Sequence, residues 1–143
     1  MSELPEEKDP PSRARERWRR HAVEEYGNPQ NLTLSQAGDY ARLNPKAIRA
    51  REIANQLYAL PDPTRTGKWR YPQWQFDAQP LRLACILQMF SQTNRWVLHS
   101  FMVNRRNMLN GKSPTEAILD ESTDIQRVVT LAQMILTGEQ GAT

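Results

Sequence analysis

A dipeptide that breaks a helical pattern constrains the fold of this chain more than any other feature. In the stretch NLTLSQAGDYARLNPKAIRAREIANQLYAL, apolar and small side chains recur at helical spacing until Asn44-Pro45 interrupts them. Asparagine suits a helix N-cap and proline suits the first helical position, so a second helix is predicted to begin at once. Thr33 or Ser35 can cap the first helix. Two short helices across so tight a turn predict a helix-turn-helix.

The faces of these two helices follow from the same spacing. One face of the first helix carries Leu34, Ala37, Tyr40 and Ala41. Ile48 is expected to fill the space between the helices, because the small side chain of Ala37 allows a close approach. The lower face of the second helix is expected to comprise Ala47, Ala50, Ile53, Ala54 and Leu57.

The segment LTLSQAGDYARLNPKAI resembles the opening of winged helix-turn-helix domains of the MerR/excisionase type. The positions that match in kind are Leu32, Thr33, Ala37, Leu43 and Ile48. The resemblance implies a wing, with a short strand near residues 57–60, a turn around Thr66-Gly67, and a strand over residues 69–76. Arg51-Glu52 stands where that family usually carries apolar residues, which implies a second helix that is rotated or longer than usual.

Aromatic side chains gather in KWRYPQWQFD, between a Pro-rich loop and an apolar run. Alternate residues of a returning wing strand face the helices, so Trp69, Tyr71 and Trp74 are expected to cover the Ala-rich helix pair. Trp74 and Phe76 are also expected to form an apolar plug between the wing and the segment that follows. The alternative interpretation is a surface on which the bases of a single strand stack.

Charge is distributed unevenly along the chain. The net charge is only +3, from 19 basic and 16 acidic residues, but residues 42–106 hold eleven basic and three acidic ones. Residues 107–143 reverse this balance. The middle of the chain is therefore expected to contact the phosphates of double-stranded DNA. The expected DNA is the protein's own operator. The predicted DNA-binding residues are Arg42, Lys46, Arg49, Arg51, Arg65, Lys68 and Arg70.

The N-terminal part is predicted to be a charged arm with one helix. Its first twelve residues are acidic and punctuated by proline, and we expect them to be disordered. From Ser12, a possible cap, Trp18, Ala22 and Tyr26 recur every four residues and predict a helix that Gly27 ends. The arginines of this helix are compatible with two interpretations, contacts with phosphate groups or simple exposure to solvent.

The C-terminal part reads as a series of helices, over residues 80–92, 93–109, 114–119 and 122–138, the last capped by Ser122 or Thr123. Their apolar surface exceeds what a chain this small readily covers, so a homodimer is expected. The residues predicted at a partner or dimer interface are Trp96, Phe101, Leu109, Pro114, Ile125, Val128 and Leu136.

Residues 70–138 also resemble the Xre/MbcA/ParS antitoxin group. The matching residues are Tyr71, Pro72, Gln75, Phe76, Trp96, Leu109, Gly111, Pro114, Leu119, Arg127, Val128 and Ala132. The resemblance implies a C-terminal domain that binds and occludes a protein toxin, often of the RES type, and an N-terminal half that binds its own operator. Most members carry a helix-turn-helix of the Xre kind, whereas this one resembles the MerR kind.

Little in the chain points to catalysis, and we expect no enzymatic activity, cofactor or metal. His21 lies in a charged helix, and His99 lies in the apolar WVLHSFM, where a core or interface histidine is expected. No His/Cys cluster has the spacing of metal ligands, and the glycines are isolated. The single cysteine, Cys85, is expected to be a buried, inert thiol in a reducing cytosol. No apolar run approaches the roughly 20 residues of a membrane span, so a soluble cytoplasmic protein is expected.

The sequence therefore predicts a mainly α protein, with a small winged helix-turn-helix followed by an all-helical C-terminal domain. The expected parts are a flexible charged arm (residues 1–27), the winged helix-turn-helix (28–77), and a helical partner-binding or dimerisation domain (78–143). The predicted function is a DNA-binding, antitoxin-type transcriptional repressor that neutralises a cognate toxin through its C-terminal helices. Two alternatives stay open: a stand-alone DNA-binding regulator, and an interaction or adaptor protein without DNA binding.

Overall fold

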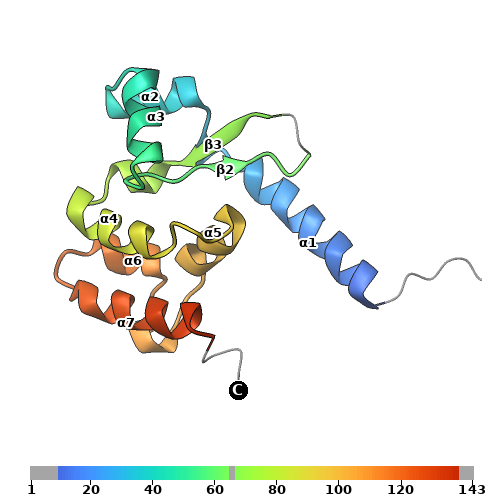
Figure 1. Ribbon diagram of the computed structural model, residues 1–143, viewed down its shortest axis with the longest axis vertical. Coiled ribbons are helices and arrows are strands. Elements are labelled where there is room, and N and C mark those ends of the chain that lie inside the picture. Colours follow the sequence, from blue (N-terminus) through green and yellow to red (C-terminus); the bar gives the residue numbers. More distant parts are fainter. Residues whose placement is uncertain (1–9, 65–66, 139–143) are drawn as a thin grey trace, which may run out of the picture.

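Helices and one small sheet make up residues 10–64 and 67–138, which the computed structural model describes (Figure 1). The α-helices are α1 (Pro10–Tyr26), α2 (Leu34–Ala41), α3 (Pro45–Ile53), α4 (Pro80–Met89), α5 (Arg95–Val103), α6 (Pro114–Leu119) and α7 (Ile125–Leu136). The strands are β1 (Asn31–Leu32), β2 (Leu60–Pro61) and β3 (Trp69–Pro72), and two 3-10 helices cover Gln73–Phe76 and Asn107–Leu109. The prediction of a mainly α protein is confirmed.

The break at Asn44-Pro45 produces the two helices that the sequence predicted. Thr33 caps α2 through a reciprocal pair of hydrogen bonds with Gln36, and the Asn44 side chain accepts a hydrogen bond from the Ala47 amide (2.8 Å). Between the helices, Arg42 adopts a left-handed conformation (φ 57°), which turns the chain within two residues. Ile48 is completely buried between the helices, as predicted.

The predicted lower face of α3 is wrong in part. Ile53 is 82% exposed, and Ala50 and Ala54 are exposed as well, whereas Ala47 is half-buried and Leu57 is buried. The cause is the rotation of the helix, which turns Glu52 toward β3. The Glu52 carboxylate accepts a hydrogen bond from the Tyr71 hydroxyl (2.6 Å).

Gly38 marks the closest approach of α2 to the turn that follows it. A Cβ atom at this position would lie 2.8 Å from the backbone oxygen of Leu43, which cannot swing away as a flexible side chain would. Gly38→Ala should therefore lower the free energy of unfolding by about 1–2 kcal/mol, despite the better helix propensity of alanine. Thermal or urea unfolding measures this change.

Gly27→Ala is the matched control for that substitution. Gly27 follows the last residue of α1, and its added Cβ would meet only ordinary contacts, the nearest at 3.5 Å. We expect it to be neutral or slightly stabilising. Equal unfolding curves for the two variants would contradict the close approach at Gly38.

The sheet forms from segments on both sides of the helix pair. Its strand order is β1-β3-β2, with both pairs antiparallel. In the hairpin of β2 and β3, Leu60 pairs with Arg70, and Leu32 of β1 pairs with Tyr71 on the other edge of β3. The sequence predicted the hairpin strands over longer ranges and did not predict β1. β3 ends at Pro72, which has no amide hydrogen, and the chain turns into a 3-10 helix there.

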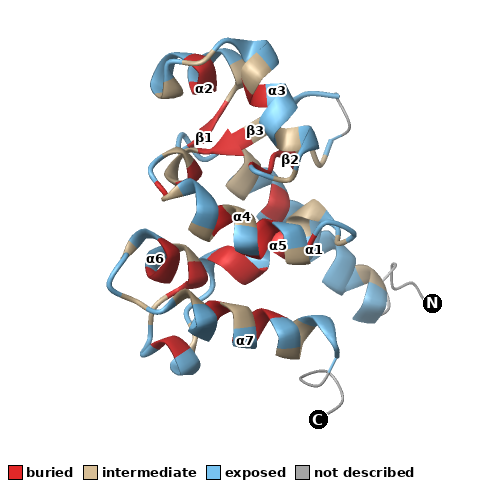
Figure 2. Ribbon diagram, turned by 60° about the vertical axis from the view of Figure 1, so that its left-hand side comes forward, coloured by how far each residue is buried: buried red, intermediate tan, exposed pale blue. Residues whose placement is uncertain are grey.

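The hydrophobic core is continuous across the whole molecule. Figure 2 shows the buried residues in the sheet and in the helices below it, with α2 and α3 at one end and α7 at the other. A single cluster of buried side chains runs from Leu32 to Ala132, and Trp74 and Phe76 pack against it. This position agrees with the plug that the sequence predicted. The boundary between residues 77 and 78 stays a prediction.

Gln75 joins two segments of this core. Its side chain is 2% exposed and forms two hydrogen bonds with the backbone of Tyr58. The Gln75 side-chain oxygen accepts from the Tyr58 amide (2.9 Å), and its NH₂ group donates to the Tyr58 carbonyl (2.8 Å). The segment between α3 and β2 is thereby fixed to the 3-10 helix after β3.

α1 extends away from the rest of the molecule and joins it at its C-terminal end (Figure 1). The helix begins at Pro10, so residues 10–12, which were predicted to be disordered, are helical, and Ala22 is its one buried residue. The rest of the segment predicted to be disordered, residues 1–9, lies outside the described residues. Trp18 makes an edge contact with Trp96 of α5, with 6.2 Å between ring centroids. Toward the end of the helix, the Tyr26 hydroxyl donates a hydrogen bond to the backbone oxygen of Lys68 (3.0 Å).

The C-terminal helices lie within the predicted ranges, with three corrections. The helix predicted over residues 93–109 ends at Val103, and a separate 3-10 helix covers Asn107–Leu109. Asp124 caps α7, because the Ser122 and Thr123 hydroxyls are engaged with the Asp120 carboxylate. Cys85 is exposed, not buried, because α4 turns Leu83, Ile86 and Leu87 inward and leaves Cys85 and Leu81 in solvent. In the described part of the chain, no helix has the length and apolar character that crossing a bilayer needs.

Candidate nucleic-acid interface

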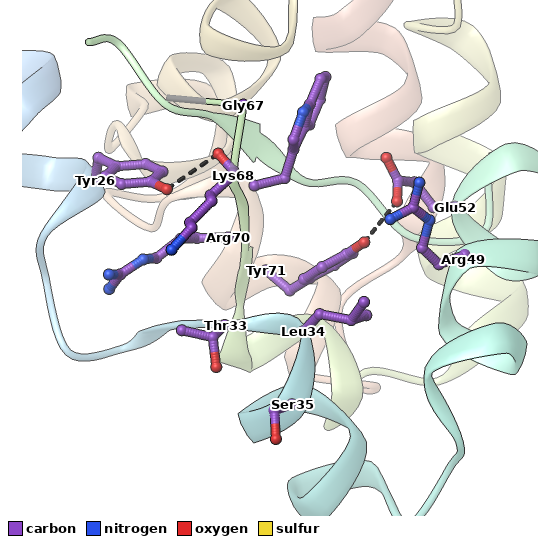
Figure 3. A pocket seen from close by; sticks show the side chains of 11 residues that line it. Tyr26, Thr33, Leu34, Ser35, Arg49, Glu52, Gly67, Lys68, Arg70 and Tyr71 are labelled. Carbon is purple, nitrogen blue, oxygen red and sulfur yellow. Dashed lines mark hydrogen bonds between the residues drawn. The ribbon is translucent and has the colours of Figure 1, made fainter. Parts of the chain in front are cut away.

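A cleft of about 630 Å³ opens between the start of α2, the outer side of α3 and the hairpin (Figure 3). The residues that line it are Tyr26, Thr33, Leu34, Ser35, Arg49, Glu52, Gly67, Lys68, Trp69, Arg70 and Tyr71. They come from four segments that are distant in the sequence, because β1 leads directly into α2 and β3 returns beside β1. The cleft exists only once the sheet has formed.

Three of the predicted DNA-binding residues meet in this cleft. Arg49 lines it from α3, and Lys68 and Arg70 line it from the hairpin, with their side chains directed toward Tyr26 and away from Arg49 (Figure 3). The Arg70 guanidinium lies over the ring of Tyr26, 4.9 Å from its centroid. Because the Tyr26 hydroxyl also donates a hydrogen bond to the backbone oxygen of Lys68, α1 supports the hairpin at Lys68 and Arg70.

One carboxylate lies among these cations. Glu52 accepts the hydrogen bond from Tyr71, and burial together with this bond raises the pKa of the Tyr71 hydroxyl. Tyr71 therefore stays a neutral donor at every physiological pH. The Glu52 carboxylate is thus hydrogen-bonded within the protein. The three basic side chains outnumber this one carboxylate, so the cleft walls carry a net positive charge.

The other four predicted DNA-binding residues lie elsewhere. Arg42 is exposed in the turn between α2 and α3, and Lys46 is exposed in the first turn of α3. Arg51 lines a second groove on the other side of α3, together with Tyr40 and Phe76, so it does not share the cleft with Arg49. Arg65 lies outside the described residues.

Trp69 departs from its prediction as a core residue. It is 42% exposed and lines the cleft, whereas Tyr71, two residues further along the same strand, is 2% exposed. Trp74 packs against the core and lies 6.2 Å from Tyr58 between ring centroids. The three aromatics therefore divide, with Tyr71 and Trp74 in the core and Trp69 facing the cleft.

The predicted partner interface is corrected by burial. Phe101, Leu109, Pro114 and Val128 are buried in the protein's own core, where they hold α5, α6 and α7 together and offer no surface to a partner. Trp96 and Ile125 are half-buried, and Leu136 is 39% exposed. The apolar side chains that these helices do expose include Val97, Val103 and Met108.

A buried polar network joins α1, α5 and the segment before β2. The Glu25 carboxylate lies 2.7 Å from Nε2 of His99, and the Tyr58 hydroxyl lies 2.8 Å from Nδ1 of the same ring. The carboxylate requires a hydrogen on Nε2, which leaves Nδ1 of a neutral His99 to accept from Tyr58. Burial lowers the pKa of His99, partly offset by Glu25. His99 is thus a core histidine, one of the two roles that the sequence predicted.

Several lining residues were not predicted as site residues. Thr33, Leu34 and Ser35 were assigned only to the start of a helix, and Tyr26 only to an apolar stripe. A signal for Tyr26 existed, because a tyrosine at the end of a helix keeps a polar tip beside an apolar body. Within the described residues, no group of three or more His, Cys, Asp or Glu side chains is placed to hold a metal ion.

Comparison with protein-family models, with curated proteins and with solved structures found no match for this chain.

Proposed function

We propose that this protein is a DNA-binding transcriptional repressor of the antitoxin type, with a winged helix-turn-helix that contacts duplex DNA. The observation that carries the proposal is the meeting of Arg49 from α3 with Lys68 and Arg70 from the hairpin in one cleft. In this proposal α3 is the recognition helix and the β2–β3 hairpin is the wing. The protein acts in the cytoplasm, on its own operator.

The order of elements supports the winged helix-turn-helix. A helix, a short strand, two helices across a tight turn and then a hairpin follow one another from α1 to β3. The first strand adds to the returning strand of the hairpin, which brings the hairpin beside α3. An α-helix fits the major groove of DNA, and a hairpin beside it reaches the DNA backbone or the next groove.

The charge of the exposed residues also supports DNA as the ligand. Lys46 and Arg49 lie three residues apart on α3, and both are exposed. Each lysine or arginine that neutralises a phosphate releases counterions, so binding through these residues depends on salt. Arg49 can also form a bidentate contact with a guanine edge if α3 enters the major groove.

The antitoxin part of the proposal rests on the resemblance of residues 70–138. α5 and its surroundings expose Val97 and Val103, which suit a protein partner better than solvent. We assign these exposed side chains, in place of the buried ones, to a protein toxin of the RES type or to a second copy of the chain. Co-expression with the product of an adjacent reading frame tests this assignment, since relief of growth arrest should be lost in Val97→Asp.

The DNA-binding proposal is tested by two substitutions in the same helix. Arg49→Ala should weaken binding to a duplex that contains the region upstream of its reading frame by about tenfold, and should reduce the slope of log K against log salt by about 0.9. If Arg49 reads a base edge, discrimination at one base pair should fall by about 1–3 kcal/mol. Mobility-shift or anisotropy titrations at several salt concentrations measure both effects.

Arg51→Ala is the matched control, because it removes the same charge from the opposite side of α3. It should leave the affinity and the salt slope unchanged. Equal losses in both variants would mean that binding follows net charge and not the cleft. If the parent protein binds no duplex at low salt, the alternative function, an adaptor protein that does not bind DNA, is favoured.

A further inference from the structure

Trp69 is a large aromatic side chain that the protein's own core leaves uncovered. Side chains alternate along a strand, so β3 presents Trp69 and Tyr71 on one face of the sheet. α2 and α3 cover the Tyr71 end of this face, where Glu52 bonds the Tyr71 hydroxyl. Trp69 lies two residues nearer to the tip of the hairpin and remains 42% exposed. The apolar face of the sheet therefore continues beyond the helices that cover it.

Positive charge lies on both sides of β3 beside this apolar surface. Arg49 lines the cleft from α3, and Lys68 and Arg70 line it from the hairpin, on the face of β3 opposite to Trp69. The carboxylate of the cleft, Glu52, already accepts a hydrogen bond from Tyr71. A ligand complementary to these walls has an apolar patch between negative charges. The sugar–phosphate backbone of a nucleic acid has this alternation, with a deoxyribose between successive phosphates.

We infer that Trp69 packs against the deoxyribose of the DNA strand that runs through the cleft, between the phosphates held by Lys68, Arg70 and Arg49. This inference rests on the proposed DNA binding. It follows from the position of the cleft, because α3 in a major groove and the hairpin at the next groove leave one backbone strand between them. Trp69 thus adds affinity that is apolar in origin and independent of base sequence.

The apolar origin gives a distinct experimental signature. Trp69→Ala should weaken duplex binding by about tenfold at every salt concentration, because it removes apolar burial and no charge. The slope of log K against log salt should stay that of the parent. Lys68→Ala should instead reduce the slope by about 0.9. Trp69→Phe should recover most of the lost affinity. Anisotropy titrations of the full chain with a labelled duplex, and with the matching single strand, measure all four proteins.

Trp18→Ala is the matched control, because Trp18 is also exposed, at 53%, but lies on α1 outside the cleft. It should bind DNA as the parent does. Thermal melts verify that each variant folds. A Trp69→Ala protein that binds the duplex like the parent, or that loses salt slope, overturns the inference while the proposed function stands. A loss confined to the single strand also overturns it and favours base stacking. A parent that binds no duplex overturns both.

Discussion

Gln75→Met should lower the free energy of unfolding by about 2–6 kcal/mol, the largest effect that we expect from a single substitution. Methionine keeps the unbranched shape of glutamine but has no amide, so the Tyr58 amide and carbonyl both lose their partner. Tyr58 is completely buried, and water cannot replace the lost bonds. Each unsatisfied buried backbone group costs about 1–3 kcal/mol, so the two groups together cost about 2–6 kcal/mol. Urea unfolding at neutral pH measures it.

Gln88→Met is the control for the same chemical change at an exposed site of α4. It should alter the free energy of unfolding by less than about 0.5 kcal/mol. If Gln75→Met unfolds at the same urea concentration as this control, the two hydrogen bonds are not what holds the segment before β2 to the 3-10 helix.

Local signals in the sequence were sufficient where a structure depends on neighbours along the chain. Asn44-Pro45 specifies the start of α3 because a cap and a proline act within one turn of helix. Thr33 and Gln36 specify the start of α2 in the same way. The first residues of these two helices were therefore predictable before any tertiary contact was known.

The choice between core and surface was less predictable, because it depends on partners that are distant in sequence. Trp69 and Trp74 lie in the same aromatic stretch, yet the helices reach only Trp74 and leave Trp69 in the cleft. Cys85 sits in an apolar run, and only the rotation of α4 decides that it faces solvent. The role of Gln75 required its partner, Tyr58, seventeen residues earlier in the chain.

The expected interface shows the same limit. Phe101 and Val128 belong to helices whose apolar faces suggested a dimer, but α4–α7 bury those faces against one another. A pattern of apolar residues indicates that one face of a helix is buried. It does not indicate whether a segment of the same chain or another protein buries that face. The predicted DNA-binding residues divide for a related reason, because Arg49 and Arg51 differ by two positions and so lie on different sides of one helix.

His99→Phe should lower the free energy of unfolding by about 2–4 kcal/mol at pH 7.5. The substitution leaves the buried Tyr58 hydroxyl without an acceptor and Glu25 without its partner on α5. This difference should shrink as the pH falls. Burial lowers the pKa of His99 in the folded state, so the unfolded chain takes up the proton first. The stability that neutral His99 contributes is complete above about pH 6.5, the pKa of a free imidazole, and is lost as the pH falls through the folded pKa. Urea unfolding at several pH values measures the convergence.

Two substitutions separate the partners of the imidazole and should shift its titration in opposite directions. Tyr58→Phe removes the hydroxyl that occupies Nδ1, the atom that takes the proton, so the pKa of His99 should rise. Glu25→Gln removes the negative charge that favours the protonated ring, so the pKa of His99 should fall. The chain has two histidines, so the imidazole region of a proton NMR spectrum holds one other signal, from exposed His21. Shifts in the same direction for both variants would contradict the assignment of Nε2 as donor to Glu25 and of Nδ1 as acceptor from Tyr58. The opposite shifts would establish His99 as the neutral link through which α1 is fixed to α5.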